Sequence, residues 1–144
     1  MKYLDSSVFL RIVLRQRGAL PTMEIKNSVA SELLLTEALR TIDRLRFQTS
    51  IEPSQMVLIR DNVFKLIRHT ELILLSRQIL RRAASPFSVP LGTLDAIHLS
   101  TAILWRERTS KAMAFLTHDR ELELAAKAEG FPTLTATADI NRRR

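Results

Sequence analysis

Short runs of apolar residues alternate with longer amphipathic segments along the chain. The short runs, which predict β-strands, cover residues 2–4, 28–31, 71–75, 112–116 and 131–134. The longer segments repeat apolar residues every three or four positions, which predicts helices over about residues 8–18, 34–45, 53–67, 77–84, 94–106 and 121–129. Strands that alternate with helices favour a parallel sheet covered on both faces. We therefore expect an α/β fold, a three-layer α/β/α sandwich with a mainly parallel central sheet.

Polar and small residues mark several of the predicted helix ends. Ser6 or Ser7 can cap the first helix and Ser76 the fourth, because a serine hydroxyl accepts a hydrogen bond from a free backbone N–H group. Thr93 is placed to cap the helix that begins at residue 94. Gly130 ends the last helix, since glycine readily adopts the left-handed conformation that closes a helix.

Length and composition favour one domain. A chain of 144 residues with 46% hydrophobic residues can bury a single core, so we expect one domain over residues 1–140 and a basic C-terminal tail over residues 141–144. The sequence has no cysteine, which excludes disulfides, zinc ribbons and thiol nucleophiles. Asp5 interrupts the stretch where a signal peptide needs apolar residues, and no long apolar segment follows. We expect a soluble, cytoplasmic protein without a membrane segment.

The chain is strongly basic, with a net charge of +7 and a pI near 10.8. It has 17 arginines and 5 lysines, and arginine makes planar, two-pronged contacts with phosphate groups. Nucleic acid is the polyanionic partner that this charge favours. Many proteins are basic for solubility alone, so charge by itself does not decide between the two interpretations.

Four acidic residues lie where an apolar run gives way to a helix: Asp5, Glu37, Asp95 and Asp119. In a parallel sheet such positions meet at the carboxyl ends of the strands. Two like charges about 4 Å apart cost about 4 kcal/mol at an effective dielectric constant near 20, so such a group favours a bound cation. Oxygen ligands suit Mg²⁺ or Mn²⁺, which promote hydrolysis of a nucleic acid backbone. Three of the acids also have a simpler explanation: Asp5 and Asp119 can be helix caps, and Asp95 can be a first-turn charge that complements a helix dipole.

Four sequence motifs resemble those of the PIN-domain family, and more narrowly those of the VapC toxins of bacterial type II toxin–antitoxin modules. The motifs are YLDSS at residues 3–7, SELLLTE at 31–37, LDAIHL at 94–99 and LTHDR at 116–120. The resemblance implies a metal-dependent endoribonuclease toxin that uses Mg²⁺ or Mn²⁺ and is neutralised by a cognate VapB-like antitoxin. It also implies a homodimer. The family's catalytic, metal-binding acids match Asp5, Glu37, Asp95 and Asp119.

Two glutamates compete for the second acidic position. Glu32 lies five residues before Glu37, in the predicted first turn of the same helix. Glu37 falls a turn further into the helix and begins a Glu-Ala-Leu-Arg stretch that is typical of these toxins. We therefore assign the metal-binding role to Glu37.

Other polar residues are candidates for supporting roles. The hydroxyl groups of Ser6 and Thr117 can hydrogen-bond a metal-bound water or a phosphate, or can cap a helix. Arg40 and Arg44 lie one helical turn apart near Glu37 and can contact RNA phosphates, or can face solvent. His98 follows Asp95 by three residues, and a packed helix position is favoured over a ligand or general base.

Two other classes of protein compete with the nuclease. A non-catalytic PIN-like module that binds RNA or protein would be predicted if acids were missing, but all four are present. A phosphotransfer receiver domain also has an aspartate after a strand, yet it needs a neighbouring acid pair and a suitably placed lysine, and Lys111 does not follow a strand. Spacing alone leaves transfer, ribosomal and messenger RNA all open as substrates.

Overall fold

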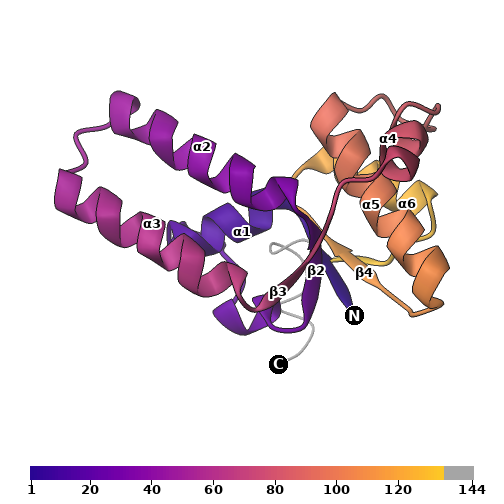
Figure 1. Cartoon of the computed structure of the whole chain (residues 1–144), viewed down its shortest axis with the longest axis horizontal. Helices are drawn as coiled ribbons and strands as arrows, with labels where there is room; N and C mark the ends of the chain where they lie inside the picture. The colour runs from indigo at the N-terminus through magenta and orange to yellow at the C-terminus, as the bar shows by residue number, and fades with distance from the viewer. Residues whose placement is uncertain (135–144) are drawn as a thin grey trace.

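A computed structural model describes residues 1–134, and its centre is a five-stranded parallel sheet (Figure 1). The predicted tail at residues 141–144 lies outside the described residues. The strands are β1 (Lys2–Leu4), β2 (Ser28–Ser31), β3 (Thr70–Ile73), β4 (Ala114–Leu116) and β5 (Thr133–Leu134). Their order across the sheet is β3-β2-β1-β4-β5, and every neighbouring pair is parallel. The predicted parallel sheet is confirmed.

Helices cover both faces of the sheet, which confirms the three-layer α/β/α sandwich (Figure 1). The first group is α1 (Ser6–Val13), α2 (Leu33–Gln48) and α3 (Pro53–Ile67). The second group is α4 (Arg77–Ala83), α5 (Thr93–Thr109) and α6 (Arg120–Ala128). A short 3-10 helix, η1 (Thr22–Ile25), precedes β2 and was not predicted. No helix in residues 1–134 is long and apolar enough to span a membrane.

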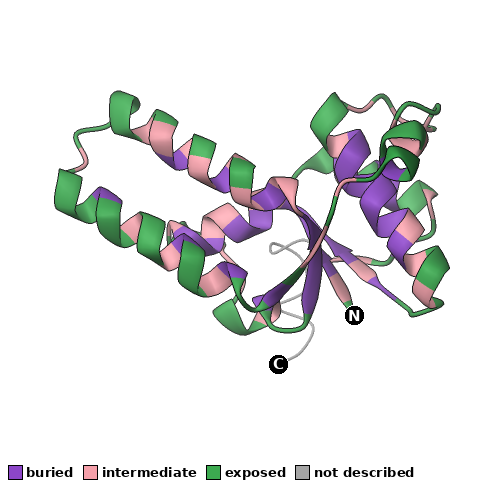
Figure 2. Cartoon of the chain, in the orientation of Figure 1, coloured by how far each residue is buried: buried purple, intermediate pink, exposed green. Residues whose placement is uncertain are grey.

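Alternate residues of the central strands point to opposite faces and bury two separate cores (Figure 2). The core beneath α1, α2 and α3 receives Leu4, Ala30 and Leu116. The core beneath α5 and α6 receives Tyr3, Val29 and Phe115. The three central strands are apolar on both faces because helices cover both faces of the sheet.

Helices α2 and α3 form a pair that projects beyond the sheet (Figure 1). One face of α3 is buried, through Met56, Val63 and Ile67. Leu58, on another side of the same helix, is largely exposed. The helix predicted over residues 53–67 is thus amphipathic in the structure.

Strand ends differ from the prediction where a pairing partner is missing. β2 ends at Ser31, which pairs with Ile73, so β3 ends at Ile73 and not at Leu75. The backbone N–H of Leu75 instead donates to the carboxylate of Glu32, at 2.5 Å. The predicted strands at residues 112–116 and 131–134 likewise shorten to β4 and β5, because only these residues find partners in the ladder.

Helix ends also differ from the prediction. Asp5, and neither Ser6 nor Ser7, is the N-cap of α1, and α1 ends at Val13, before Arg15 turns into the left-handed conformation with φ 51°. Gly92, not Thr93, precedes α5, which runs three residues past the predicted end at residue 106. Ser76 caps α4 by accepting from the N–H of Ile79, as predicted. Gly130 follows α6 with φ +80°, which confirms the predicted end.

Candidate active site

The candidate acids come from four elements at the carboxyl edge of the sheet. Asp5 directly follows β1, and its backbone N–H donates to the carbonyl oxygen of Leu116 at the end of β4. Asp119 follows β4 as the N-cap of α6. Glu37 lies in the second turn of α2, and Asp95 lies in the first turn of α5. The parallel topology therefore brings residues from both halves of the chain to one edge.

Asp5 is almost fully buried, with 3% of its surface exposed. Its Oδ2 atom accepts three hydrogen bonds, from the Ser7 N–H at 3.2 Å, the Ser7 hydroxyl at 2.5 Å and the Thr117 hydroxyl at 2.9 Å. No donor in residues 1–134 reaches its Oδ1 atom. The carboxylate is thus fixed by one oxygen, and the other is free to accept a ligand.

The hydroxyl groups of Ser7 and Thr117 join Asp5 to the turn that precedes α6. Ser7 Oγ accepts from the backbone N–H of His118 at 2.9 Å, and Thr117 Oγ1 accepts from the N–H of Asp119 at 3.0 Å. Each hydroxyl also donates to Asp5, so each acts in both directions. This network fixes the β4–α6 turn relative to β1.

Asp95 experiences the repulsion that the clustering of acids predicts. Its pKa is raised from 3.8 to about 6, first by partial burial and then by the negative charges of Asp5, Asp119 and Glu37. The charge of His98 opposes this rise in the pKa. Asp5, Glu37 and Asp119 are therefore close enough to raise the pKa of Asp95, although the four acids are up to 114 residues apart in sequence.

Glu37 is held by a buried histidine. Its Oε2 atom lies 2.6 Å from Nε2 of His98, whose side chain is 1% exposed. Nδ1 of the same ring lies 3.0 Å from the hydroxyl of Tyr3. Burial lowers the pKa of His98, but the hydrogen bond to Glu37 and the nearby carboxylates raise it more, so the net shift is upward. Burial also raises the pKa of the Tyr3 hydroxyl well above its usual value, which keeps that hydroxyl protonated.

Asp119, the fourth candidate, and Glu32, the alternative to Glu37, each have a structural partner. Oδ1 of Asp119 accepts from the N–H of Leu122 at 2.8 Å, so this exposed residue does cap α6. The carboxylate of Glu32 is engaged with the N–H of Leu75 at the end of β3. Glu32 is also absent from the charges that shift the pKa of Asp95, whereas Glu37 is among them. The structure thus brings Glu37 into the acidic group.

A cavity of about 520 Å³ opens beside the acids. Its lining includes Glu37, Ser6 and the two candidate arginines, Arg40 and Arg44. Arg40 also forms an ion pair with Asp43 at 3.0 Å, while the Arg44 guanidinium donates to the hydroxyl of Thr41. Two arginines and a glutamate therefore line the same cavity. This combination suits a phosphodiester that contacts the arginines beside a cation held by carboxylates.

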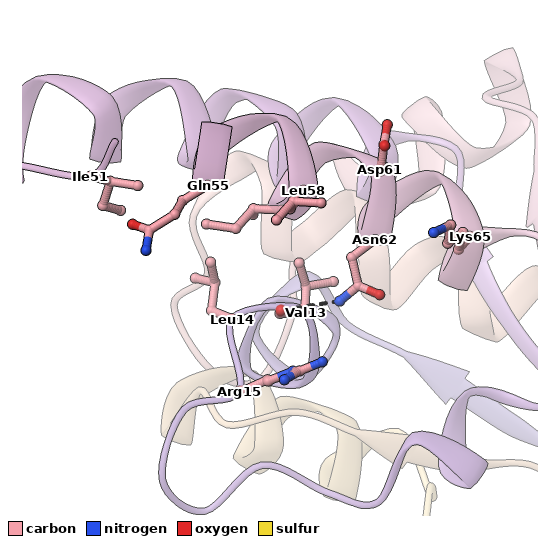
Figure 3. A pocket seen from close by; sticks show the side chains of 10 residues that line it. Val13, Leu14, Arg15, Ile51, Gln55, Leu58, Asp61, Asn62 and Lys65 are labelled. Atoms are coloured by element: carbon pink, nitrogen blue, oxygen red, sulfur yellow. Dashed lines mark hydrogen bonds between the residues drawn. The ribbon is translucent and has the colours of Figure 1, made fainter. Parts of the chain in front are cut away.

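A second cavity, of about 510 Å³, lies between the end of α1 and α3 (Figure 3). Figure 3 shows Asn62 reaching from α3 to the carbonyl oxygen of Val13, a hydrogen bond of 3.3 Å. None of the four candidate acids lines this cavity. It is therefore separate from the acidic edge.

Comparison with known families agrees with this geometry. The PIN domain family matches residues 2–128, which is most of the chain. The chain belongs to the PIN domain family. PIN domains are generally nucleases that use divalent metal ions. A comparison with curated proteins finds no significant match.

The donor atoms of this PIN domain suit a divalent cation in type and charge. All four acids offer carboxylate oxygens, and each has at least one oxygen that accepts no protein hydrogen bond within residues 1–134. In the same residues no lysine or arginine forms an ion pair with any of them. As the side chains stand, however, no group of three or more histidine and acidic residues in the described part of the chain could hold a metal ion.

Two contacts at this site differ from the predictions. The residue that hydrogen-bonds Asp5 is Ser7, which follows the candidate Ser6 in the YLDSS motif. His98 is buried, as predicted, but it also contacts Glu37. No sequence signal links Tyr3 to His98, because their contact depends on how β1 packs against α5.

Proposed function

We propose that this PIN domain is a metal-dependent endoribonuclease that hydrolyses RNA phosphodiester bonds. The observation that supports this most is the grouping of carboxylates around Asp95. Burial, and then the negative charges of Asp5, Asp119 and Glu37, raise the pKa of Asp95 to about 6, and no lysine or arginine in residues 1–134 forms an ion pair with any of the four acids. Repulsion between these carboxylates opposes folding, and a bound divalent cation would offset it.

In this proposal Asp5, Glu37, Asp95 and Asp119 hold Mg²⁺ or Mn²⁺. A bound cation of this kind would polarise a phosphoryl oxygen and lower the pKa of an attacking water. The chain's own groups supply orientation. Thr117 and Ser7 fix one oxygen of Asp5 by hydrogen bonds, so that the other keeps its direction. Ser6 lies on the wall of the cavity, where its hydroxyl can contact a phosphate.

RNA is the proposed substrate because the cavity beside Glu37 is lined by cations. Arg40 and Arg44 are exposed on consecutive turns of α2 and can contact phosphates on either side of the bond that is cut. The net charge of +7 provides long-range attraction for a polyanion. The acids themselves would repel RNA if no cation neutralised them.

We further propose that the protein is a VapC-like toxin, that a cognate VapB-like antitoxin neutralises it, and that it forms a homodimer. The resemblance of the four acidic motifs supports this proposal, as does the family match over residues 2–128. We also propose a single domain over residues 1–140. Induced expression in bacteria should stop growth, and co-expression of the antitoxin should restore it. Unimpaired growth with the folded protein present would argue against a toxin.

The experiment that tests the nuclease is cleavage of RNA by the purified protein. We expect cleavage with Mg²⁺ or Mn²⁺, and none with chelator or with the Asp5→Asn and Asp95→Asn proteins. Purifying all variants in parallel controls for contaminating nucleases. Equal cleavage by the wild type and both variants would refute the assignment of these acids.

One observation favours a second function, a non-catalytic module that binds RNA or protein. The carboxylates of the described residues do not form a closed group that could hold a metal ion. A protein that binds RNA with the same affinity in chelator and in Mn²⁺, and cuts none, would be such a module.

A further inference from the structure

A continuous chain of hydrogen bonds leads from the centre of the sheet to Glu37. The backbone N–H of Ser31 in β2 donates to the hydroxyl oxygen of Tyr3 in β1, at 3.0 Å. That hydroxyl lies 3.0 Å from Nδ1 of His98 in α5, and Nε2 of His98 lies 2.6 Å from Oε2 of Glu37 in α2. Four separate elements therefore contribute to the placement of one carboxylate.

The chemistry of the groups sets the direction of each bond. An ionised carboxylate only accepts, so Nε2 of His98 must carry the proton that it donates to Glu37. The Tyr3 oxygen already accepts from Ser31. When the imidazole is neutral, the Tyr3 hydrogen donates to Nδ1; when the imidazole is charged, Nδ1–H donates to the Tyr3 oxygen instead. In both forms Nε2 donates to Glu37.

Packing holds both rings in place. Tyr3 is completely buried and stacks on Phe115, with ring centroids 4.9 Å apart and planes inclined by 17°. His98 meets the Tyr3 ring edge-on, with centroids 6.2 Å apart. The side chain of Glu37, by contrast, is 18% exposed and lines the cavity beside the acids. The series of hydrogen bonds thus leads from the packed core to the wall of the cavity beside the acids.

We propose that His98, oriented by Tyr3, is a positioning residue that holds Glu37 by Oε2 and so presents its other oxygen, Oε1, to the cation of the active site. This inference rests on the proposed metal-dependent function. No donor in residues 1–134 reaches Oε1. Burying a polar ring is costly unless it is fully hydrogen-bonded, and a leucine would fill the same space without that cost. The histidine therefore does more than fill the core: partners of this kind fix the orientation of metal ligands.

The test measures the dissociation constant for Mn²⁺ by calorimetry, together with the melting temperature of each metal-free protein. His98→Leu removes the donor, and His98→Gln restores an N–H group near the position of Nε2. Ile103→Ala, in the same helix and the same core, is the control for lost packing. Asp95→Asn is the control for the metal site itself.

We expect His98→Leu to bind Mn²⁺ about 10- to 100-fold more weakly than the wild type, as is typical when a partner of a metal ligand is lost. His98→Gln should recover most of the affinity, and Ile103→Ala should lower the melting temperature but leave the dissociation constant unchanged. RNA cleavage should follow the same order. Higher Mn²⁺ affinity in His98→Gln than in His98→Leu would show that the N–H group holds Glu37. A role in packing alone predicts no advantage of glutamine over leucine.

Other results would overturn the inference. If the wild type binds Mn²⁺ and Asp95→Asn does not, but His98→Leu binds as tightly as the wild type or more tightly, His98 does not position Glu37 and the proposed function survives. If the wild type binds no Mn²⁺, the proposed function fails and the positioning role fails with it. If His98→Leu does not fold, Tyr3→Phe provides the test. Unchanged Mn²⁺ affinity in that variant would contradict the proposal that Tyr3 orients His98.

Discussion

Thr117 donates a hydrogen bond to Oδ2 of Asp5 across 112 positions of the sequence, at 2.9 Å. The bond joins the ends of two adjacent parallel strands, β1 and β4. Asp5 would otherwise be a buried carboxylate with only Ser7 as a partner. The hydrogen bond that fixes Asp5 in the candidate site therefore also connects the ends of β1 and β4.

Replacement of Thr117 should therefore affect stability. Thr117→Val keeps the shape of the side chain but removes the donor to Asp5 and the acceptor for the N–H of Asp119. We expect a loss of about 1–3 kcal/mol in the free energy of unfolding, measured by urea denaturation, because the N–H of Asp119 loses its acceptor and the buried carboxylate of Asp5 keeps only Ser7 as a donor. Thr117→Ser, which keeps the hydroxyl, should lose clearly less. Equal losses would indicate that packing, and not the hydroxyl, matters.

Asp95→Asn should stabilise the metal-free protein. The pKa of Asp95 is about 6 in the folded protein against an ordinary value of 3.8, so the folded state binds the proton more tightly than the unfolded state does. Stability contributed by this group therefore falls as the pH rises from about 4 to about 6 and stays low above that. The variant removes the penalty, so its melting temperature should exceed that of the wild type above pH 6 and match it below pH 4.

Chelator must be present in that comparison, since a bound cation would cancel the repulsion. Asp61→Asn is a suitable control, because it removes one negative charge from an exposed position on α3. An equal gain in melting temperature from Asp61→Asn would show that overall charge, and not the acidic edge, causes the effect.

Arg40 and Arg44 should contribute to RNA affinity through phosphates. For single-stranded RNA, each lost phosphate contact reduces the slope of log affinity against log salt concentration by about 0.7, so Arg40→Gln/Arg44→Gln should flatten it by about 1.4. Binding can be measured with Asp95→Asn as the background, so that cleavage does not interfere. Arg68→Gln/Arg108→Gln removes the same charge from the opposite edge of the sheet and should change the slope little. Identical slopes for the two double variants would refute a local contact.

Asp119 has two possible contributions, a cap and a charge, which two substitutions separate. Asp119→Asn keeps a side-chain oxygen that can accept from Leu122, whereas Asp119→Ala removes it and should cost about 1 kcal/mol of stability. We expect both variants to lose RNA cleavage, because both remove the negative charge. Full cleavage by Asp119→Asn would restrict the residue to its role as a cap.

The sequence predicts the layers of this fold better than its boundaries. Five apolar runs separated by helical patterns are sufficient to predict a parallel sheet with helices on both faces. They do not predict that β3 ends at Ile73, because that depends on its pairing with Ser31 in a strand about 40 residues earlier. Asp5 is the N-cap of α1 although two serines follow it, since its backbone is extended and its carboxylate reaches the N–H of Ser7.

The candidate site, like the fold, is predicted only in part by the sequence. The motifs single out the acids. Asp5 and Asp119 follow strands, whereas Asp95 lies in the first turn of a helix and Glu37 in the second. The partners of those acids are not visible in the sequence: His98 and Glu37 are 61 positions apart, and only the packing of α5 against the sheet and the position of α2 bring them together. Ser7 differs from Ser6 only in pointing back toward Asp5, which depends on the first turn of α1.

We propose that four carboxylates at one edge of the sheet bind a divalent cation. A crystal of the protein grown with Mn²⁺ and measured at a wavelength where manganese scatters anomalously would test this proposal. We predict an anomalous peak within ligand distance, about 2.0–2.6 Å, of carboxylate oxygens from Asp5 and Asp95, with Oε1 of Glu37 facing it. A folded protein in millimolar Mn²⁺ with no peak among these carboxylates would contradict the proposal.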